Sequence, residues 1–378
     1  MDRVLVVYGT RPEAIKMAPV VVELSRSNAV QPVVAVTGQH REMLDQVNSL
    51  FDIRPAYDLD IIRPRQELHQ ITQRALDGMV DVIRQERPAA VMVQGDTTTT
   101  MVSALAAFYE QVPVIHLEAG LRTQNRYNPF PEEINRRLTT QLSSLHLAPT
   151  STSRGNLLAE GVDPSSVVVT GNTVIDALLG VVSRDLPLEN PALSVLDGRP
   201  AVLVTSHRRE SWGEPMARTA AAIAQLAREF PDVQFVLPAH LNPRVREVLL
   251  PPLEHLANVT VTEPLSYSDF ARAMAASTLM LTDSGGVQEE APSLGKPVLV
   301  LRETTERPEA VDAGTVRLVG TDVDAIVSSV RRLLTDPSEY DAMARTVNPY
   351  GDGRAAARTR AAVEHFFGHG DRLPDFAS

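Results

Sequence analysis

Residues 4–26 read VLVVYGTRPEAIKMAPVVVELSR and contain one complete strand–turn–helix unit. The β-branched run at residues 4–8 is typical of a buried strand. A polar turn follows at residues 9–13, and residues 14–26 have helical spacing of apolar side chains. The alternation returns, with further short apolar runs at residues 33–36, 89–93, 112–117, 145–148 and 167–170. Alternating strands and helices predict a parallel sheet covered on both faces.

A second series of strands and helices begins after a break in the pattern. Residues 186–199 are rich in Pro, Asn and Asp and are typical of a linker or surface loop. Apolar runs resume at residues 201–205, 233–237, 259–261, 278–282, 298–301 and 316–319. The chain has 378 residues, whereas a single core stops growing at about 250–300. We therefore predict an α/β protein with two Rossmann-like, doubly wound domains at residues 1–172 and 173–354, with a C-terminal helix at 355–378 packing back on the first.

Composition limits the classes of protein to which the chain can belong. Apolar residues make up 43% and charged residues 22%, as in ordinary globular proteins. Cysteine is absent, which excludes disulfides and cysteine nucleophiles. The net charge of −11 argues against a general nucleic-acid binder. No apolar run approaches the ~20 residues of a membrane helix, and the N-terminal strand lacks signal-peptide features, so we expect a cytoplasmic protein.

Polar peptides follow most of the predicted strands. Ligands of open α/β sheets bind outside the carboxyl ends of the strands. Both halves carry such peptides, so we expect the active site in a cleft between two facing domains. The peptides lie at residues 9–13, 37–40, 94–97, 116–120, 171–173, 206–210, 238–243, 283–286 and 302–309.

Two of these turns are candidates for phosphate binding. Residues 283–290 (DSGGVQEE) combine a strand end, two glycines and a helix start, where free N–H groups can meet a phosphate. Glu290 could accept hydrogen bonds from two ribose hydroxyls. Residues 9–13 open another helix, and Arg11 and Lys16 suit a diphosphate. The alternative for each turn is an ordinary helix start.

Missing motifs restrict the chemistry further. No Gly-x-Gly-x-x-Gly follows the first strand, which argues against a nicotinamide dinucleotide. Neither Lys16 nor Lys296 has a tyrosine four residues earlier, which excludes the Tyr-x-x-x-Lys pair of NAD-dependent sugar-nucleotide epimerases. A Gly-x-Ser-x-Gly elbow is also missing. We therefore expect acid–base chemistry without a cofactor or a metal.

Five ionisable side chains are placed for such chemistry. Asp96, Glu118 and His207 each follow a strand, and Glu132 and Glu133 follow a proline-fixed turn at residues 129–133 (PFPEE). Carboxylates and an imidazole in one cleft can hold different pKa values and divide acid and base roles. Each residue alone is more simply explained as a helix cap or an ion-pair partner, whereas the group together predicts an active site.

Eight peptides, spread over nearly the whole chain, closely resemble those of the bacterial non-hydrolysing UDP-N-acetylglucosamine 2-epimerases. They lie at residues 9–19 (GTRPEAIKMAP), 39–44 (QHREML), 95–99 (GDTTT), 116–123 (HLEAGLRT), 207–210 (HRRE), 283–290 (DSGGVQEE), 305–309 (TERPE) and 348–353 (NPYGDG). The resemblance implies a fold similar to the GT-B glycosyltransferases, with UDP bound by residues 173–354. It also implies interconversion of UDP-GlcNAc and UDP-ManNAc for cell-envelope polysaccharides, by a protein that is usually a homodimer.

The resemblance implies roles for individual residues. Those implied to bind the diphosphate are Arg11, Lys16, Arg307 and the backbone of Ser284, Gly285 and Gly286. Glu290 would bind the ribose, and Phe270 would line the uracil pocket. Leu265 stands where some relatives have a polar residue. The residues implied to surround the reacting sugar are Asp96, Glu118, Glu132 and His207.

The reaction implied by the resemblance is elimination of UDP to 2-acetamidoglucal, followed by re-addition after protonation on the other face. In some relatives a second UDP-GlcNAc binds beside the active site and activates it. The matching residues here are Gln39, His40, Arg65, Arg208 and His240, whose alternative roles are to serve the single active site or to face solvent. Three other functions stay open: a GT-B-type glycosyltransferase, a hydrolysing 2-epimerase and a non-enzymatic nucleotide-sugar sensor.

Overall fold

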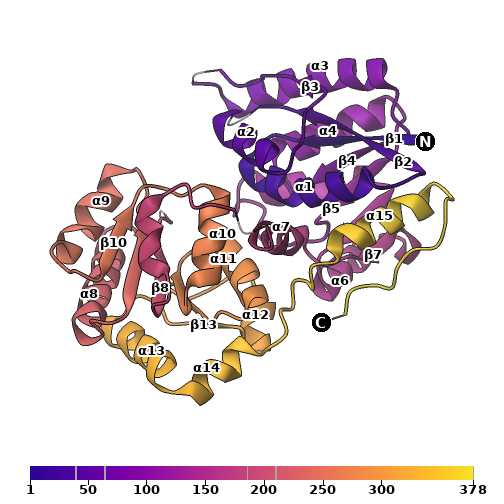
Figure 1. Ribbon diagram of the computed structural model, residues 1–378. Coiled ribbons are helices and arrows are strands. Elements are labelled where there is room, and N and C mark those ends of the chain that lie inside the picture. The colour runs from indigo at the N-terminus through magenta and orange to yellow at the C-terminus, as the bar shows by residue number, and fades with distance from the viewer. Residues whose placement is uncertain (39–40, 64, 185, 209–210, 378) are drawn as a thin grey trace. The chain divides into compact units, whose positions relative to one another are not determined.

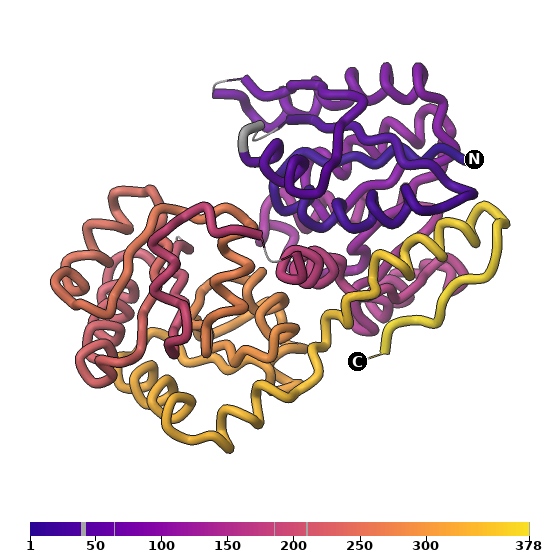
Figure 2. Tube along the Cα trace, in the orientation of Figure 1, coloured from indigo at the N-terminus to yellow at the C-terminus, as the bar shows by residue number. Residues whose placement is uncertain are grey.

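A computed structural model describes residues 1–38, 41–63, 65–184, 186–208 and 211–377. The chain divides into two compact units, which are described separately. Unit 1 comprises Met1–Ala177 and Tyr350–Ser378, and unit 2 comprises Leu178–Pro349. The chain trace in Figure 2 shows the yellow C-terminal segment lying against the indigo and magenta part of the chain. The sequence analysis placed the boundaries after residues 172 and 354.

Within the described residues, unit 1 is built on a seven-stranded sheet whose paired strands are parallel. The strand order is β3-β2-β1-β4-β5-β6-β7. The strands are β1 (Asp2–Tyr8), β2 (Val30–Val36), β3 (Tyr57–Asp58), β4 (Ala90–Gln94), β5 (Val114–Leu117), β6 (Leu145–Ala148) and β7 (Val167–Val169). The direction of winding reverses between β1 and β4, so the loops that follow these two strands meet at a topological switch point.

Helices cover both faces of this sheet (Figure 1). They include α1 (Arg11–Leu24), α2 (Arg41–Leu50), α3 (Leu68–Glu86), α4 (Thr98–Tyr109), α5 (Glu132–Leu142), α6 (Ser151–Ala159) and α15 (Ala355–Phe366). Helix α7 (Thr173–Val182) contains the boundary between the two units. Helix α1 packs against α2 and α15, whereas α4 packs against α3 and α5. Right-handed crossovers on the two sides of the switch point place these two groups on opposite faces.

Unit 2 repeats the plan with a six-stranded sheet among the residues that the structure describes. The order is β10-β9-β8-β11-β12-β13, again with parallel pairs and with the switch point between β8 and β11. The strands are β8 (Ala201–Thr205), β9 (Gln234–Pro238), β10 (Val259–Thr262), β11 (Leu279–Thr282), β12 (Val298–Val300) and β13 (Val316–Leu318). The prediction of doubly wound, Rossmann-like α/β architecture is confirmed for each unit.

The helices of unit 2 differ widely in length. They are α8 (Glu214–Glu229), α9 (Pro243–Leu249), α10 (Tyr267–Ala276), α11 (Gly285–Glu290), α12 (Pro308–Ala313), α13 (Val323–Thr335) and α14 (Pro337–Ala344). Helices α8 and α13 pack together over the sheet, and Ile223, Leu226 and Val330 join Phe235 in one buried apolar cluster. The short helices α11 and α12 follow strands β11 and β12, and predicted site residues lie at these strand ends.

Three local expectations are corrected by the structure. Helix α1 begins at Arg11 rather than after the turn, because Thr10 and Glu13 form a capping box and Pro12 occupies the first turn. The 186–199 segment is not wholly irregular, since it contains the 3₁₀ helix η2 (Pro191–Leu196) and its Glu189 and Asn190 N–H groups donate to the Asp269 carboxylate. The final helix ends at Phe366, short of residue 378.

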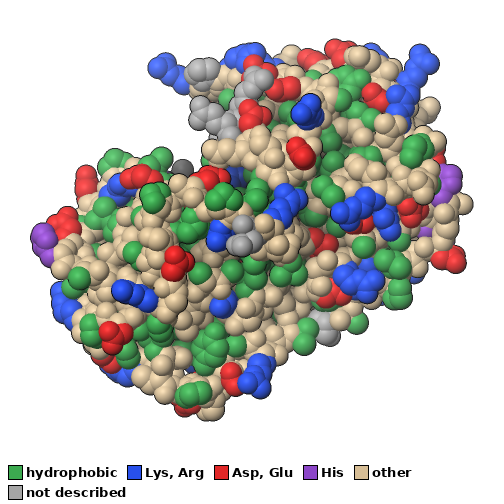
Figure 3. Space-filling model, in the orientation of Figure 1, with side chains coloured by type: hydrophobic (Ala, Val, Ile, Leu, Met, Phe, Trp, Pro, Cys, Tyr) green, Lys and Arg blue, Asp and Glu red, His purple; other side chains and the backbone are tan. Residues whose placement is uncertain are grey.

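The chain beyond α15 returns to the sheet of unit 1. The N–H of Phe376 donates to the carbonyl of Val169 in β7 (2.8 Å), and the Phe376 ring lies under the Arg358 guanidinium. On the face drawn in Figure 3, described acidic and basic side chains are interspersed over both units. Of the helices in the described ranges, none combines the length and apolar character needed to cross a bilayer.

Candidate active site residues in the two units

Glu118 is the centre of a polar cluster at the carboxyl edge of the unit 1 sheet. Its Oε1 pairs with Nζ of Lys16 on α1, and its Oε2 accepts from Nε2 of Gln94 at the end of β4. Nδ2 of Asn172, which follows β7, also donates to Oε1 (3.4 Å). Both charged side chains are largely buried. The structure thus brings together two of the predicted site residues, Lys16 and Glu118, from distant parts of the sequence.

The backbone around Glu118 holds its side chain toward this cluster. Glu118 has φ +62°, a left-handed conformation that is uncommon outside glycine. A Cβ on Gly95, in the facing β4–α4 turn, would lie 3.4 Å from the Glu118 carboxylate. The buried His116 donates from Nε2 to the carbonyl of Gly95 (2.7 Å). Burial lowers the pKa of His116 to about 3, so this imidazole stays neutral and ties the two turns together.

Asp96 has a different partner in the same region. Its Oδ2 pairs with Nη2 of Arg136 on α5, and its carbonyl accepts from Nδ2 of Asn135 (2.9 Å). Nη1 of Arg136 also contacts Glu133 Oε2 (3.3 Å). Glu118 and Asp96 therefore follow neighbouring strands but lie in distinct environments, one with a lysine and amides and the other with an arginine.

Glu133, rather than Glu132, is the buried carboxylate of α5. Its side chain is fully buried and accepts from the Thr123 N–H (3.0 Å) and from Arg137 Nε (2.9 Å). Burial alone would raise the pKa of Glu133, but these hydrogen bonds and the charge of Arg136 outweigh it and hold the pKa below its ordinary value. Glu132 is the partly exposed first residue of α5 and has no ion pair with a described residue. A catalytic role for Glu132 stays a prediction.

Glu13 joins the turn after β1 to the turn after β4. It is fully buried and accepts from the Gly9 N–H (3.0 Å) and the Thr10 N–H (2.7 Å) in its own turn. Across the switch point it accepts from the Thr97 hydroxyl (2.6 Å). Burial raises the pKa of Glu13. The hydrogen bonds of Glu13 hold the turn that carries Arg11 against the turn that carries Asp96. Arg11 itself is partly buried at the start of α1.

In unit 2, His207 and Asp283 follow the two strands at the switch point, β8 and β11. Nδ1 of His207 lies 3.4 Å from Oδ1 of Asp283. The Asp283 side chain is fully buried, whereas nearly half of the His207 side chain is exposed. The exposed part of the imidazole is thus available to a ligand while its inner edge faces a carboxylate.

The predicted phosphate-binding turn lies beside these two residues in the chain. Ser284 is the N-cap residue of α11, and the absent side chain of Gly285 lets Arg307 lie against this turn, since a Cβ there would lie 2.5 Å from Nη1 of Arg307. Nε of Arg307 donates to Oε1 of Glu289 (2.6 Å). The structure therefore brings the predicted diphosphate residues Ser284, Gly285 and Arg307 together, and Gly286 follows in the same turn of α11.

Glu290 and Phe270 belong to facing parts of the same unit. Glu290 is buried, and its Oε1 accepts from the hydroxyl of Tyr267 (3.2 Å). Phe270 lies one turn further along α10 from Tyr267 and is half-buried. Leu265, which precedes α10, is buried. This hydrogen bond connects Glu290 to the helix that carries Phe270.

The residues expected at a second nucleotide site are only partly described. Gln39 and His40 lie outside the described residues. Arg65 is exposed on a loop, with φ +60°. Arg208 lies 3.6 Å from Glu306, and the ring of His240 stacks on that of His207 with centroids 6.4 Å apart. The structure brings Arg208 and His240 close to His207, because β8 and β9 are neighbouring strands.

Comparison with known proteins identifies the family. The family model described as UDP-N-acetylglucosamine 2-epimerase matches residues 22–364. A UDP-N-acetylglucosamine 2-epimerase from Escherichia coli K12 is 52% identical over 372 residues, which is 96% of this chain and 98% of that protein. The chain belongs to the UDP-N-acetylglucosamine 2-epimerase family. The resemblance inferred from the eight peptides is confirmed at this level.

Solved structures of UDP-N-acetylglucosamine 2-epimerases have the same fold. A putative member from Listeria monocytogenes superimposes with a TM-score of 0.94 at 46% identity, covering 100% of this chain and 99% of that one. The enzyme from Neisseria meningitidis bound to UDP-GlcNAc gives a TM-score of 0.86 at 49% identity, covering 97% and 99%. These matches confirm the predicted two-domain, GT-B-like α/β fold.

Four polar residues of this epimerase-family chain emerge only from the structure. Gln94, Asn172 and Asp283 lie in peptides that the sequence analysis singled out, but nothing in the sequence showed which side chains they contact. Arg136 was not considered at all. The sequence does contain a signal for this contact, because Arg136 lies three residues after Glu133 on a predicted helix start, and side chains at that spacing on a helix are neighbours.

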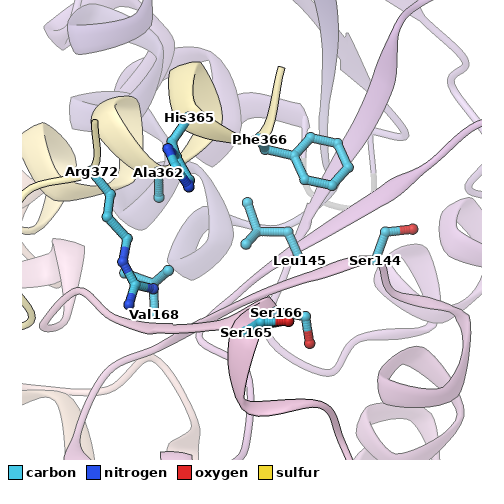
Figure 4. A pocket seen from close by; sticks show the side chains of 9 residues that line it. All are labelled: Ser144, Leu145, Ser165, Ser166, Val168, Ala362, His365, Phe366 and Arg372. Atoms are coloured by element: carbon cyan, nitrogen blue, oxygen red, sulfur yellow. The ribbon is translucent and has the colours of Figure 1, made fainter. Parts of the chain in front are cut away.

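A separate cavity in unit 1 of the epimerase-family chain has a volume of about 240 Å³ (Figure 4). Leu145, Val168 and Phe366 give it an apolar side, and Arg372 lies at its rim. It lies at the amino ends of β6 and β7, opposite the edge that carries Glu118 and Asp96. No predicted site residue lines it. Among the described residues, no group of three or more His, Cys, Asp and Glu side chains is arranged to hold a metal ion.

Proposed function

We propose that the chain interconverts UDP-GlcNAc and UDP-ManNAc by inverting carbon 2, with UDP retained in the product. Membership of the family supports an epimerase acting on UDP-GlcNAc. The relative from Neisseria meningitidis, 49% identical, is described with UDP-GlcNAc bound, which supports this nucleotide sugar as the substrate.

The chemistry of the substrate favours elimination over direct proton exchange. Carbon 2 carries the N-acetyl group, and its proton is not acidic. In the proposed forward step the bond from carbon 1 to the UDP oxygen breaks, a base takes the carbon 2 proton, and a double bond forms between carbons 1 and 2. The products of that step are UDP and 2-acetamidoglucal. Protonation of carbon 2 from the opposite face, with return of UDP to carbon 1, gives the epimer.

The observation that carries the proposal is the pair of carboxylates, Asp96 and Glu118, after neighbouring strands. Asp96 pairs with Arg136, whereas Glu118 pairs with Lys16 and accepts from Gln94. Elimination and re-addition need one group to take a proton and another to supply one. Carboxylates with different partners are suited to divide these roles. We propose that both act at the sugar, together with Glu132 and His207.

We propose that the residues of unit 2 bind the UDP moiety. Arg307 lies against the Gly285 turn, so a guanidinium and backbone N–H groups occur at one place, as diphosphate binding requires. The buried Glu290 would accept from the ribose hydroxyls, and Phe270 would contact uracil. Lys16 and Arg11 would stabilise the charge that develops on the departing diphosphate.

The decisive experiment is product analysis with UDP-GlcNAc alone. We expect proton and phosphorus NMR to show UDP-ManNAc accumulating to an equilibrium mixture, without added NAD or metal. In D₂O the product should carry deuterium at carbon 2. Stoichiometric free ManNAc and UDP would indicate a hydrolysing epimerase instead, and an unchanged substrate that reacts only with an acceptor would indicate a glycosyltransferase. Retention of protium at carbon 2 would rule out the elimination mechanism.

We further propose that a second UDP-GlcNAc activates the enzyme through Gln39, His40, Arg65, Arg208 and His240. Arg208 and His240 beside His207 support a second ligand near the catalytic imidazole. Pure UDP-ManNAc should then react after a lag that a trace of UDP-GlcNAc abolishes, and Arg65→Ala should lose this response. A full initial rate without the trace contradicts the proposal.

The remaining proposals concern the location of the enzyme, its oligomeric state and the use of its product. We propose a cytoplasmic homodimer whose product supplies cell-envelope polysaccharide synthesis. Sedimentation equilibrium of the purified chain measures the oligomeric state directly. A mass of about 41 kDa at micromolar concentration, the mass of one chain, would contradict the dimer.

A further inference from the structure

Asp283 is a buried carboxylate whose two oxygens have unequal surroundings. Its Oδ2 accepts from the N–H groups of His207 (2.9 Å) and Arg208 (3.0 Å) and lies 3.4 Å from the hydroxyl of Ser206. Its Oδ1 is buried and makes no hydrogen bond with a described residue. Across the described part of the chain, the one ion-pair contact of Oδ1 is with Nδ1 of His207, at 3.4 Å.

This arrangement dictates which nitrogen of His207 carries the proton. A buried carboxylate oxygen without a hydrogen-bond donor is energetically unfavourable. A proton on Nδ1 sets a positive hydrogen toward the Oδ1 anion, whereas a bare Nδ1 would set a lone pair against it. Because Oδ2 is already occupied by backbone donors from the β8–α8 segment itself, the carboxylate cannot turn away without breaking them.

The neighbouring His240 has the opposite arrangement. Its Nδ1 accepts from the N–H of Asn242 (3.1 Å), so its own proton is on Nε2 when the ring is neutral. The two rings stack at an interplanar angle of 13°. Among the described residues, Arg208 and its partner Glu306 are further charged groups beside His207. Of the described charged groups, Asp283 is the acceptor that faces Nδ1 of His207.

We infer that Asp283 is a positioning residue that holds His207 with its proton on Nδ1 and Nε2 as a free acceptor. The half-exposed imidazole would then offer a lone pair to the substrate, and any proton taken at Nε2 would give an imidazolium stabilised by the buried carboxylate. The catalytic use of His207 rests on the proposed function, whereas the position of the proton does not.

Nitrogen NMR of the full chain labelled with ¹⁵N-histidine tests the inference directly. Long-range proton–nitrogen spectra distinguish the two tautomers of each neutral ring, and the spectrum of His207→Gln identifies the His207 signals by their loss. At a pH where the ring is neutral, we expect His207 protonated on Nδ1 and His240 on Nε2. A wild-type His207 protonated on Nε2 overturns the inference, whatever the activity of the chain.

The variant Asp283→Asn provides a second test of the positioning role. The amide oxygen can still accept from the two backbone N–H groups, while the amide nitrogen donates to Nδ1 and moves the ring proton to Nε2. We expect this tautomer change together with a loss of at least ~10²-fold in kcat, with KM altered less than threefold. A large loss of kcat without a tautomer change would overturn the positioning role, as would the tautomer change without any loss of kcat.

The matched control is Asp336→Asn, at the N-cap of α14. One carboxylate oxygen of Asp336, Oδ1, also accepts from two backbone N–H groups, those of Ser338 (2.9 Å) and Glu339 (3.4 Å), and an amide oxygen can do the same. This exchange should leave the His207 signals and kcat unchanged. If Asp283→Asn does not fold, the wild-type spectrum still decides the inference. If the wild type does not epimerise UDP-GlcNAc, the proposed function fails while the spectrum still reports the Asp283 contact.

Discussion

Lys16 and Glu118 form an ion pair across the switch point of the unit 1 sheet, although 102 residues separate them in the chain. Lys16 lies in the second turn of α1, and Glu118 follows β5 in a left-handed conformation. Lys16 is one of two lysines in a chain whose other basic residues are arginines. In the proposed reaction, this ammonium would be a nearby cation for the departing diphosphate.

Replacing either central carboxylate by its amide should remove turnover while leaving the fold intact. We expect Asp96→Asn and Glu118→Gln each to lower kcat by about 10²–10⁴-fold, the usual contribution of a positioned acid or base. In Asp96→Asn the amide oxygen can still accept from Arg136, so the midpoint of thermal unfolding should change little. Glu118→Gln sets an amide nitrogen against Lys16 or Gln94, both of them donors, so its midpoint should fall and its kcat is measured well below that midpoint. The exposed Glu254→Gln is the control. Activity within threefold of wild type for both variants would remove these residues from the mechanism.

Arg136 should be important for stability as well as activity. Arg136→Met leaves the fully buried Glu133 without one of its two arginine partners. Breaking a buried pair in this way destabilises by about 3 kcal/mol, measured by urea unfolding. Adding Glu133→Gln should recover part of that loss, since the buried charge is then removed. Arg26→Met, at an exposed pair with Glu23, should change stability by under ~0.5 kcal/mol. Equal effects at the two arginines would contradict the structure.

Acidification should weaken the fold through His146. Burial, with a smaller effect of Arg122, lowers the pKa of His146 to about 4, against about 6.5 in an unfolded chain. Between these values the unfolded chain binds a proton that the folded chain does not, so stability falls as pH drops. We expect this residue to contribute a loss of about 2 kcal/mol between pH 7.5 and pH 5. His146→Leu should show a correspondingly smaller difference in unfolding free energy between the two pH values; an unchanged difference would refute the assignment.

Gly285→Ala should weaken UDP binding with little effect on stability. The new Cβ would lie 2.5 Å from Nη1 of Arg307, so the guanidinium must move away from the turn. We expect calorimetry to show about tenfold weaker binding of UDP, which corresponds to ~1.4 kcal/mol. Gly155→Ala is the control, because its Cβ meets nothing within 4 Å on helix α6. That variant should bind UDP normally and gain about 0.5–1 kcal/mol of stability. Unchanged UDP affinity in Gly285→Ala would show that Arg307 does not bind the diphosphate.

The sequence by itself determined the parallel α/β architecture, the division into two units and the turns that carry the candidate site residues. Each of these follows from local patterns: apolar runs of strand length, helical spacing between them, and polar or glycine-containing peptides after the strands. Short or irregular elements were not predicted. The two-residue β3 is too brief to show a sequence pattern, and the segment that contains η2 is held by the distant Asp269 carboxylate. The family also followed from the sequence, since its peptides are contiguous.

Tertiary structure alone decided which side chains meet. Glu118 contacts Lys16, Gln94 and Asn172 because β1, β4, β5 and β7 end at one edge of the sheet, an arrangement set by strand order and not by spacing in the chain. The choice between Glu132 and Glu133 as the buried carboxylate depended on the rotation of α5 about its axis. The position of Asp283 beside His207 likewise required β8 and β11 to pair across 77 residues of sequence.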